Sequence, residues 1–175
     1  MKIEYGGLRR LGDKDKELML EWMHDDRVNR NFRFDFGSMT LDRAERFISG
    51  SFTPENQNFA FVDENDAYLG TISLKNISQK DSNAEYAIVA RTLAWGTGVA
   101  YKATMDILKY AFDSLKLNRI YLNVLEENGR ANRFYDKCGF QFEGKFSEHL
   151  YLRGEYKNLN WYGMSKRQFD QMRTA

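Results

Sequence analysis

Two glycines separated by one residue mark the place where a strand-like run of the sequence gives way to a helix-like run. The strand-like run covers residues 84–89, the glycines are Gly96 and Gly98, and the helix-like run ends near Leu115. Free backbone N–H groups at a helix N-terminus attract an anion, and glycine lets a phosphate approach closely because no Cβ intervenes. The order of these elements therefore predicts a phosphate-binding loop, although a plain helix entry would use the same two glycines.

A second segment about thirty residues further along combines an amide, a small residue, a tyrosine and a Gly-Phe pair. These residues are Asn128, Ala131, Tyr135, Lys137, Gly139 and Phe140. Together the two segments resemble the GNAT family of acetyl-CoA-dependent N-acetyltransferases. The family's loop reads Gln/Arg-x-x-Gly-x-Gly/Ala, and Trp95 stands where Gln or Arg is commoner. The Trp-Gly-x-Gly-x-Ala form is similar to the branch that acetylates ribosomal-protein N-termini, polyamines and nucleotide-linked amino sugars.

The resemblance implies that acetyl-CoA is the co-substrate and that one loop and one strand hold it. The pyrophosphate would bind backbone N–H groups of the loop, namely those of Trp95, Gly96, Thr97, Gly98, Val99 and Ala100. The acetyl end would lie against Ile88 and Val89, where a backbone N–H near Val89 would stabilise the oxyanion. Asn128 and Ala131 would contact the pantetheine arm, although Asn128 is equally suited to cap the helix that follows. Trp95 more readily packs to shape the loop than stacks on CoA.

Acetyl transfer to an amine needs a group that protonates the departing thiolate and a group that accepts a proton from the amine. Tyr135 is the candidate acid, since an unperturbed phenol with a pKa of about 10 is protonated at neutral pH. Glu85 is the candidate base, acting through water, and apolar strand neighbours would raise its pKa. His24 and His149 remain alternative bases. Cys138 is expected to be a buried, unreactive thiol.

The composition describes a globular protein without a strong electrostatic field. The chain has 175 residues and a net charge of +1, with 26 basic and 25 acidic residues. Such a balance gives no expectation of nucleic-acid or membrane partners. One cysteine and two distant histidines argue against a metal site. No apolar run reaches the roughly 18 residues of a membrane helix, and the N-terminus is too polar for a signal peptide, so a soluble, cytoplasmic protein is expected.

The order of elements predicts one domain over residues 1–175 of the mixed α/β (α+β) class, with a mostly antiparallel central sheet. Helices are expected from Asp13 to about Met23 and from Thr40 to about Ile48, the latter burying Leu41, Ala44, Phe47 and Ile48. Runs at 59–62 and 68–74 form a hairpin. Residues 84–124 form a right-handed strand–helix–strand crossover, as the GNAT fold requires. Three short last strands are expected at 140–142, 150–152 and 159–164.

The acceptor is expected to be an amine on a small molecule or a peptide. Residues 22–36 look like the start of enzymes acting on nucleotide-linked 4-amino sugars, where aromatic side chains stack on the base and arginines bind the diphosphate. Peptide N-termini are an alternative. Polyamines are another, if Glu126, Glu127 and Glu148 converge. A sensor that binds acyl-CoA without turnover also stays open. A P-loop hydrolase is disfavoured, since Lys-Ser/Thr does not follow the glycines. Exposed strand edges make a homodimer plausible.

Overall fold

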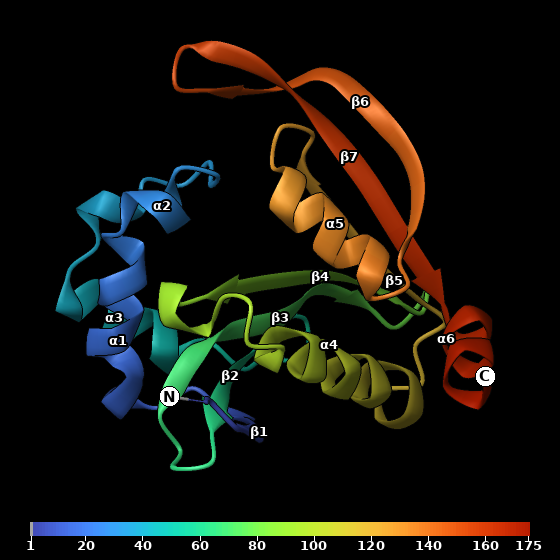
Figure 1. Ribbon diagram of the computed structural model, residues 1–175, viewed down its shortest axis with the longest axis horizontal. Helices are drawn as coiled ribbons and strands as arrows, with labels where there is room; N and C mark the ends of the chain where they lie inside the picture. Colours follow the sequence, from blue (N-terminus) through green and yellow to red (C-terminus); the bar gives the residue numbers. More distant parts are fainter. Residues whose placement is uncertain (1) are drawn as a thin grey trace.

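One seven-stranded sheet forms the centre of the molecule in the computed structural model, which describes residues 2–175 (Figure 1). Its strand order is β1-β2-β3-β4-β5-β7-β6. The strands are β1 (Tyr5–Arg10), β2 (Gln57–Asp63), β3 (Tyr68–Ser78), β4 (Asn83–Ala90), β5 (Arg119–Leu125), β6 (Gln141–Leu152) and β7 (Glu155–Ser165). The helices are α1 (Lys16–Met23), α2 (Asp26–Asn29), α3 (Leu41–Ser49), α4 (Val99–Lys109), α5 (Gly129–Lys137) and α6 (Lys166–Thr174). All neighbouring pairs except β4 and β5 are antiparallel, which confirms the predicted fold class.

The crossover from β4 through α4 to β5 is the feature that positions the site. The two strands are parallel, as predicted, but they pair only where Asn83–Glu85 face Arg119–Tyr121. Beyond these residues the second half of each strand has no partner on the side that faces the other. The carboxyl ends of β4 and β5 therefore border a slot between them, and the loops that follow both strands lie at its mouth.

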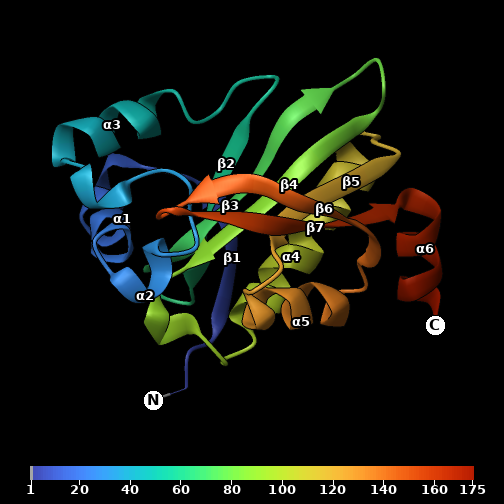
Figure 2. The same ribbon diagram turned by 90° about the horizontal axis from the view of Figure 1, so that it is seen from above.

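The sheet separates two apolar cores because successive strand residues point to opposite faces. On β2, Phe61 packs into the core with α4, whereas Ala60 and Val62 pack into the core with α1. The first core also contains residues from α5 and α6, including Tyr135 and Phe169. The long β6–β7 hairpin extends away from α6, and in both views its tip points toward the side of α1 and α2 (Figures 1 and 2).

Two helix predictions need correction. Thr40 caps α3, as its side chain accepts a hydrogen bond from the Arg43 backbone N–H, but only half of the predicted buried stripe is right, namely Ala44 and Ile48, which packs against the α1 core. Ala44 is fully buried, whereas Leu41 is 44 % and Phe47 is 42 % exposed. The first helix begins later than predicted, at Lys16, after a 3₁₀ turn that covers Asp13–Asp15.

The C-terminal part of the chain also differs from the prediction. The expected strands at 140–142 and 150–152 belong to one strand, β6, whose pairing with β7 shifts register at Phe142/Gly144 and again at Phe146/Leu150. These irregularities interrupt the alternation that marks a strand in sequence. The predicted turn at Arg153-Gly154 joins β6 to β7. The sequence analysis did not predict α6, although Ser165 and Gln168 form a capping box, a pattern that is typical of a helix N-terminus.

Candidate active site

The glycine loop leaves several backbone donors unpaired at the start of α4. Gly96 and Gly98 have φ angles of 73° and 86°, in the region that favours glycine. A Cβ at either position would meet no atom within 4 Å, so the space beside the backbone is open. Within residues 2–175, no acceptor pairs with the N–H groups of Gly98, Ala100 or Tyr101. These donors and the positive end of α4 fit a diphosphate.

Trp95 and Thr97 give the loop its shape. The Trp95 indole N–H donates to the Ala90 carbonyl oxygen over 3.1 Å, and the Thr97 hydroxyl donates to the Ala94 carbonyl oxygen over 2.7 Å. The Trp95 ring packs at the edge of the α1 core. The guanidinium carbon of Arg130 lies 3.3 Å from the ring centroid, so α5 covers one face of the indole. These contacts support the packing interpretation of Trp95.

Asn128 caps α5, because its side-chain oxygen accepts a hydrogen bond of 3.2 Å from the Ala131 backbone N–H. Asn132, one turn further on, fixes the same end of α5. Its amide N–H group donates to the carbonyl oxygens of Leu125 and Asn128, and its oxygen accepts from Asn160 and Tyr162 on β7. This network ties α5 to β5 and β7. Within residues 2–175 the amide nitrogen of Asn128 forms no hydrogen bond, and its contact with pantetheine stays a prediction.

Tyr135 belongs to the first core, and its hydroxyl forms no hydrogen bond with the residues that the structure describes. The residue is 8 % exposed, and its ring contacts Tyr86 of β4 with centroids 6.0 Å apart. No hydrogen bond joins its hydroxyl to another side chain or to the backbone within residues 2–175. The hydroxyl oxygen is not fully buried, so it keeps some contact with solvent. Burial raises the pKa of Tyr135, which keeps the phenol protonated at neutral pH. These features suit the predicted role of Tyr135 as the acid that protonates the departing thiolate.

Glu85 does not have the apolar surroundings that the sequence led us to expect. Its carboxylate lies 3.5 Å from the Lys75 ammonium and accepts a hydrogen bond of 3.0 Å from the Asn76 amide. It stands four residues before Val89, which is about 13 Å along a strand. A proton would therefore reach Glu85 only through a chain of waters. Its role as the base stays a prediction.

The other ionisable candidates are buried or held by contacts with other parts of the protein. His24 is held by the Met39 carbonyl oxygen at 2.9 Å, and His149 packs on Phe146 in β6. Cys138 is fully buried, and burial raises the pKa of its thiol to about 12, as the inert interpretation requires. Arg91, considered as a loop cation, instead forms a two-pronged ion pair with Glu21 of α1.

A cavity of about 530 Å³ opens at the mouth of the slot. Four parts of the chain meet there: α2, the glycine loop, the N-terminus of α5 and the tip of the β6–β7 hairpin. The lining residues are Arg27, Arg30, Asn31, Trp95, Glu127, Asn128, Gly129, Arg130, Leu152, Arg153, Glu155 and Lys157. Of the predicted site residues, the structure thus brings Trp95 and Asn128 together in one cavity. Arg27 and Arg30 belong to segment 22–36, whose arginines were predicted to bind a diphosphate, whereas Arg130 and Arg153 were missed because they lie far from that segment in sequence.

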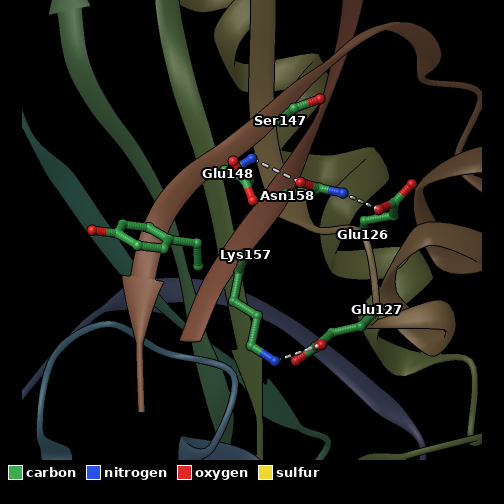
Figure 3. Close-up of a pocket in the computed structure, with 7 residues that line it drawn as sticks. Glu126, Glu127, Ser147, Glu148, Lys157 and Asn158 are labelled. Carbon is green, nitrogen blue, oxygen red and sulfur yellow. Dashed lines mark hydrogen bonds and ion pairs between the residues drawn. The ribbon is translucent and has the colours of Figure 1, made fainter. Parts of the chain in front are cut away.

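A second hollow of about 460 Å³ lies beside the hairpin and brings together the three glutamates considered for a polyamine (Figure 3). Glu126, Glu127 and Glu148 all line it, with Tyr156 and Lys157. Lys157 already binds Glu127 at 2.9 Å, and Lys145 binds Glu126 at 3.2 Å. The condition set for a polyamine, that the three glutamates converge, is therefore met, but two of the three carboxylates are paired with lysines.

The predicted stacking residues of segment 22–36 mostly serve the core. Trp22 is 4 % exposed and donates its indole N–H to the Tyr68 hydroxyl over 2.9 Å. Phe32 and Phe36 pack against it, with ring centroids 6.1 Å and 5.0 Å from that of Trp22. Phe34 is 49 % exposed. The prediction that aromatic side chains of this segment stack on a nucleotide base is therefore wrong for Trp22, Phe32 and Phe36. The arginines of this segment, by contrast, do line the cavity.

Comparison with known proteins identifies the kind of domain. The family model described as an acetyltransferase (GNAT) domain matches residues 7–141. The spermidine N(1)-acetyltransferase of Vibrio cholerae serotype O1 is 28 % identical over 144 residues, covering 80 % of this chain and 83 % of that protein. The putative ribosomal N-acetyltransferase YdaF of Bacillus subtilis strain 168 is 31 % identical over 101 residues, which cover 58 % of this chain and 55 % of YdaF.

A solved structure shows the same fold. The spermidine N-acetyltransferase from Vibrio cholerae, in a complex with CoA and spermine, superposes with a TM-score of 0.84 at 24 % identity. The match covers 93 % of this chain and 96 % of the other. In the part of the chain that the structure describes, no helix is long and apolar enough to cross a membrane.

Proposed function

The chain belongs to the GNAT family of acetyl-CoA-dependent N-acetyltransferases, and from this premise we propose that its acceptor is a primary amine on a small molecule. A nucleotide-linked amino sugar is the leading candidate. The observation that carries the proposal is the cavity of about 530 Å³ that joins the glycine loop to α2 and to the hairpin tip. Its volume lies in the range of about 300–1,000 Å³ that small-molecule sites occupy.

The residues around the slot have separate tasks in this proposal. Acetyl-CoA supplies an acetyl group activated as a thioester. The loop N–H groups hold its diphosphate, and the open space beside Gly96 and Gly98 accommodates the phosphate oxygens. The unpaired edge of β4 at Ile88 and Val89 offers backbone donors and acceptors to the pantetheine arm and the acetyl oxygen. Tyr135 holds a proton on its solvent-accessible hydroxyl for the departing sulfur.

A polyamine is the second candidate, favoured by the acidic hollow beside the hairpin. Glu148 lines this hollow without a cationic partner among residues 2–175 and can attract an ammonium group. Spermidine N(1)-acetyltransferases are among the relatives of this chain, which supports the same reading. The lysine partners of Glu126 and Glu127 oppose it, because a polyamine would have to displace them.

A panel of acceptors tests the proposal. Release of free CoA is followed with UDP-linked 4-amino sugars, spermidine, peptides with varied N-termini and aminoglycosides. The proposal expects turnover with the amino sugars and little with the others. Turnover restricted to spermidine would replace it with the second candidate, and turnover restricted to peptides would overturn both. Tight binding of acetyl-CoA without turnover of any amine would favour the sensor.

A further inference from the structure

Three arginines that line the cavity of about 530 Å³ have no carboxylate partner within residues 2–175. Five cationic side chains line this cavity. Arg27 is paired with Asp25 at 2.7 Å, and Lys157 is paired with both glutamates of the lining, Glu127 and Glu155. The remaining three, Arg30, Arg130 and Arg153, form no ion pair. The cavity therefore carries an excess of positive charge that the protein itself does not neutralise.

These three arginines come from three separate parts of the fold. Arg30 ends α2, Arg130 lies in the first turn of α5, and Arg153 lies in the turn of the β6–β7 hairpin. All three residues are exposed, so a ligand can reach their side chains from solvent. Like charges that face one cavity repel one another, and an anion between them removes that repulsion.

Arg130 is oriented for such a ligand by its stacking on Trp95. The guanidinium carbon lies 3.3 Å from the centroid of the Trp95 ring, and no hydrogen bond or ion pair within residues 2–175 uses the N–H groups of Arg130. Burial, followed by the positive charge of Arg30, lowers the pKa of Arg130. A planar guanidinium with free edge donors matches the oxygen atoms of a phosphate group.

We propose that Arg30, Arg130 and Arg153 form a phosphate-binding site that holds the diphosphate of the acetyl acceptor. This inference rests on the proposed function and names the chemistry of its substrate. It makes the acceptor a phosphorylated amine, such as a nucleoside diphosphate joined to an amino sugar. The three guanidinium groups are side-chain donors, distinct from the backbone N–H groups of the glycine loop that are proposed to hold the diphosphate of acetyl-CoA, although Arg130 packs on Trp95 of that loop. A polyamine would meet like charge in this cavity.

The phosphates of the cofactor are the other source of the same chemistry, and the test separates the two sources. UDP is titrated calorimetrically into protein saturated with CoA, with uridine as the probe that lacks phosphate. The variants are R30Q, R130Q and R153Q. The matched control is R167Q, because Arg167 is exposed on α6, outside the cavity lining, and forms no ion pair within the described residues.

The expected result is UDP binding of equal strength in the wild type and R167Q. Each cavity variant should weaken it about tenfold or more, and uridine should bind at least tenfold more weakly than UDP. Unchanged UDP affinity in the cavity variants would overturn the site. Loss of UDP binding on CoA saturation, with weaker CoA binding by the variants, would assign the arginines to the cofactor and also overturn it.

Activity distinguishes failure of this site from failure of the proposed function. An equal KM for a UDP-linked amino sugar in the wild type and R30Q would overturn the site while the proposed function stands. UDP binding that depends on the arginines, together with acetyl transfer to peptides alone, would leave an anion site at the arginines but overturn both its assignment to the acceptor and the proposed function.

Discussion

Replacing Gly98 with aspartate should weaken acetyl-CoA binding, mainly because of the negative charge of the new side chain and less because of its size. Gly98 precedes the first residue of α4 and has a φ angle of 86°. A Cβ there would meet no atom within 4 Å, so the side chain itself fits. The left-handed conformation costs a residue other than glycine about 1–2 kcal/mol, with asparagine and aspartate among those that tolerate it best. Asparagine is therefore the matched control, since it has the same size and no charge.

The charge effect has a magnitude that can be worked out. A carboxylate about 5 Å from a phosphate charge, at an effective dielectric constant of about 20, is repelled by about 3 kcal/mol. Screening by salt reduces this to about 1.5–3 kcal/mol, which corresponds to about a 10- to 100-fold loss of affinity. The same carboxylate near the N-terminus of α4 stabilises the helix by about 0.3–1 kcal/mol when acetyl-CoA is absent. G98D should therefore unfold at or above the temperature of G98N.

Calorimetry on the two variants measures this difference directly. We expect G98D to bind acetyl-CoA about 10- to 100-fold more weakly than G98N, with a ratio that shrinks as salt is added. Thermal unfolding without ligand serves as the control for structural damage. Equal affinities for G98D and G98N, or a ratio insensitive to salt, would refute the assignment of the phosphates to this loop.

Three further predictions concern residues near the slot. Tyr135→Phe should lower kcat about 100-fold, leave acetyl-CoA affinity unchanged and shift the free energy of unfolding by less than about 0.5 kcal/mol, since the hydroxyl forms no hydrogen bond within residues 2–175; equal losses of binding and turnover would mean a packing role. Asn132→Ala should cost about 2 kcal/mol in urea unfolding, because several groups lose their partner; a loss below about 0.5 kcal/mol would refute it. The Cys138 thiol, with its pKa raised to about 12, should react with Ellman's reagent only after unfolding; rapid labelling of native protein contradicts its burial.

The parts of the fold that depend on local sequence could be predicted. The strand, glycine loop and helix at 84–115 lie where their residue types place them, because the turn needs glycine and the helix needs its apolar stripe. The capping role of Thr40 is local in the same way. The stripe on α3 was only half right because periodicity shows which residues share a face, not how much of that face the sheet covers.

Long-range features had no signal in the sequence. The two register shifts in β6 depend on its pairing with β7, and β6 is an edge strand whose residues are largely exposed. The polar partners of Glu85 are Lys75 and Asn76, which lie on the neighbouring strand β3. Arg30, Arg130 and Arg153 are separated by about twenty to a hundred residues, and only the folded chain brings them to one cavity. Motifs predicted the residues of the proposed cofactor site, whereas the proposed acceptor site depends on the tertiary structure.

The fate of the acetyl group tests the central claim most directly. The protein is mixed with acetyl-CoA carrying an isotopically labelled acetyl group and with a UDP-linked amino sugar, and the products are analysed by mass spectrometry. We predict that the label moves to the amine nitrogen of the sugar and that none is found on the protein, including Cys138. Label that stays on acetyl-CoA, or that accumulates on the protein, would contradict direct transfer to this acceptor.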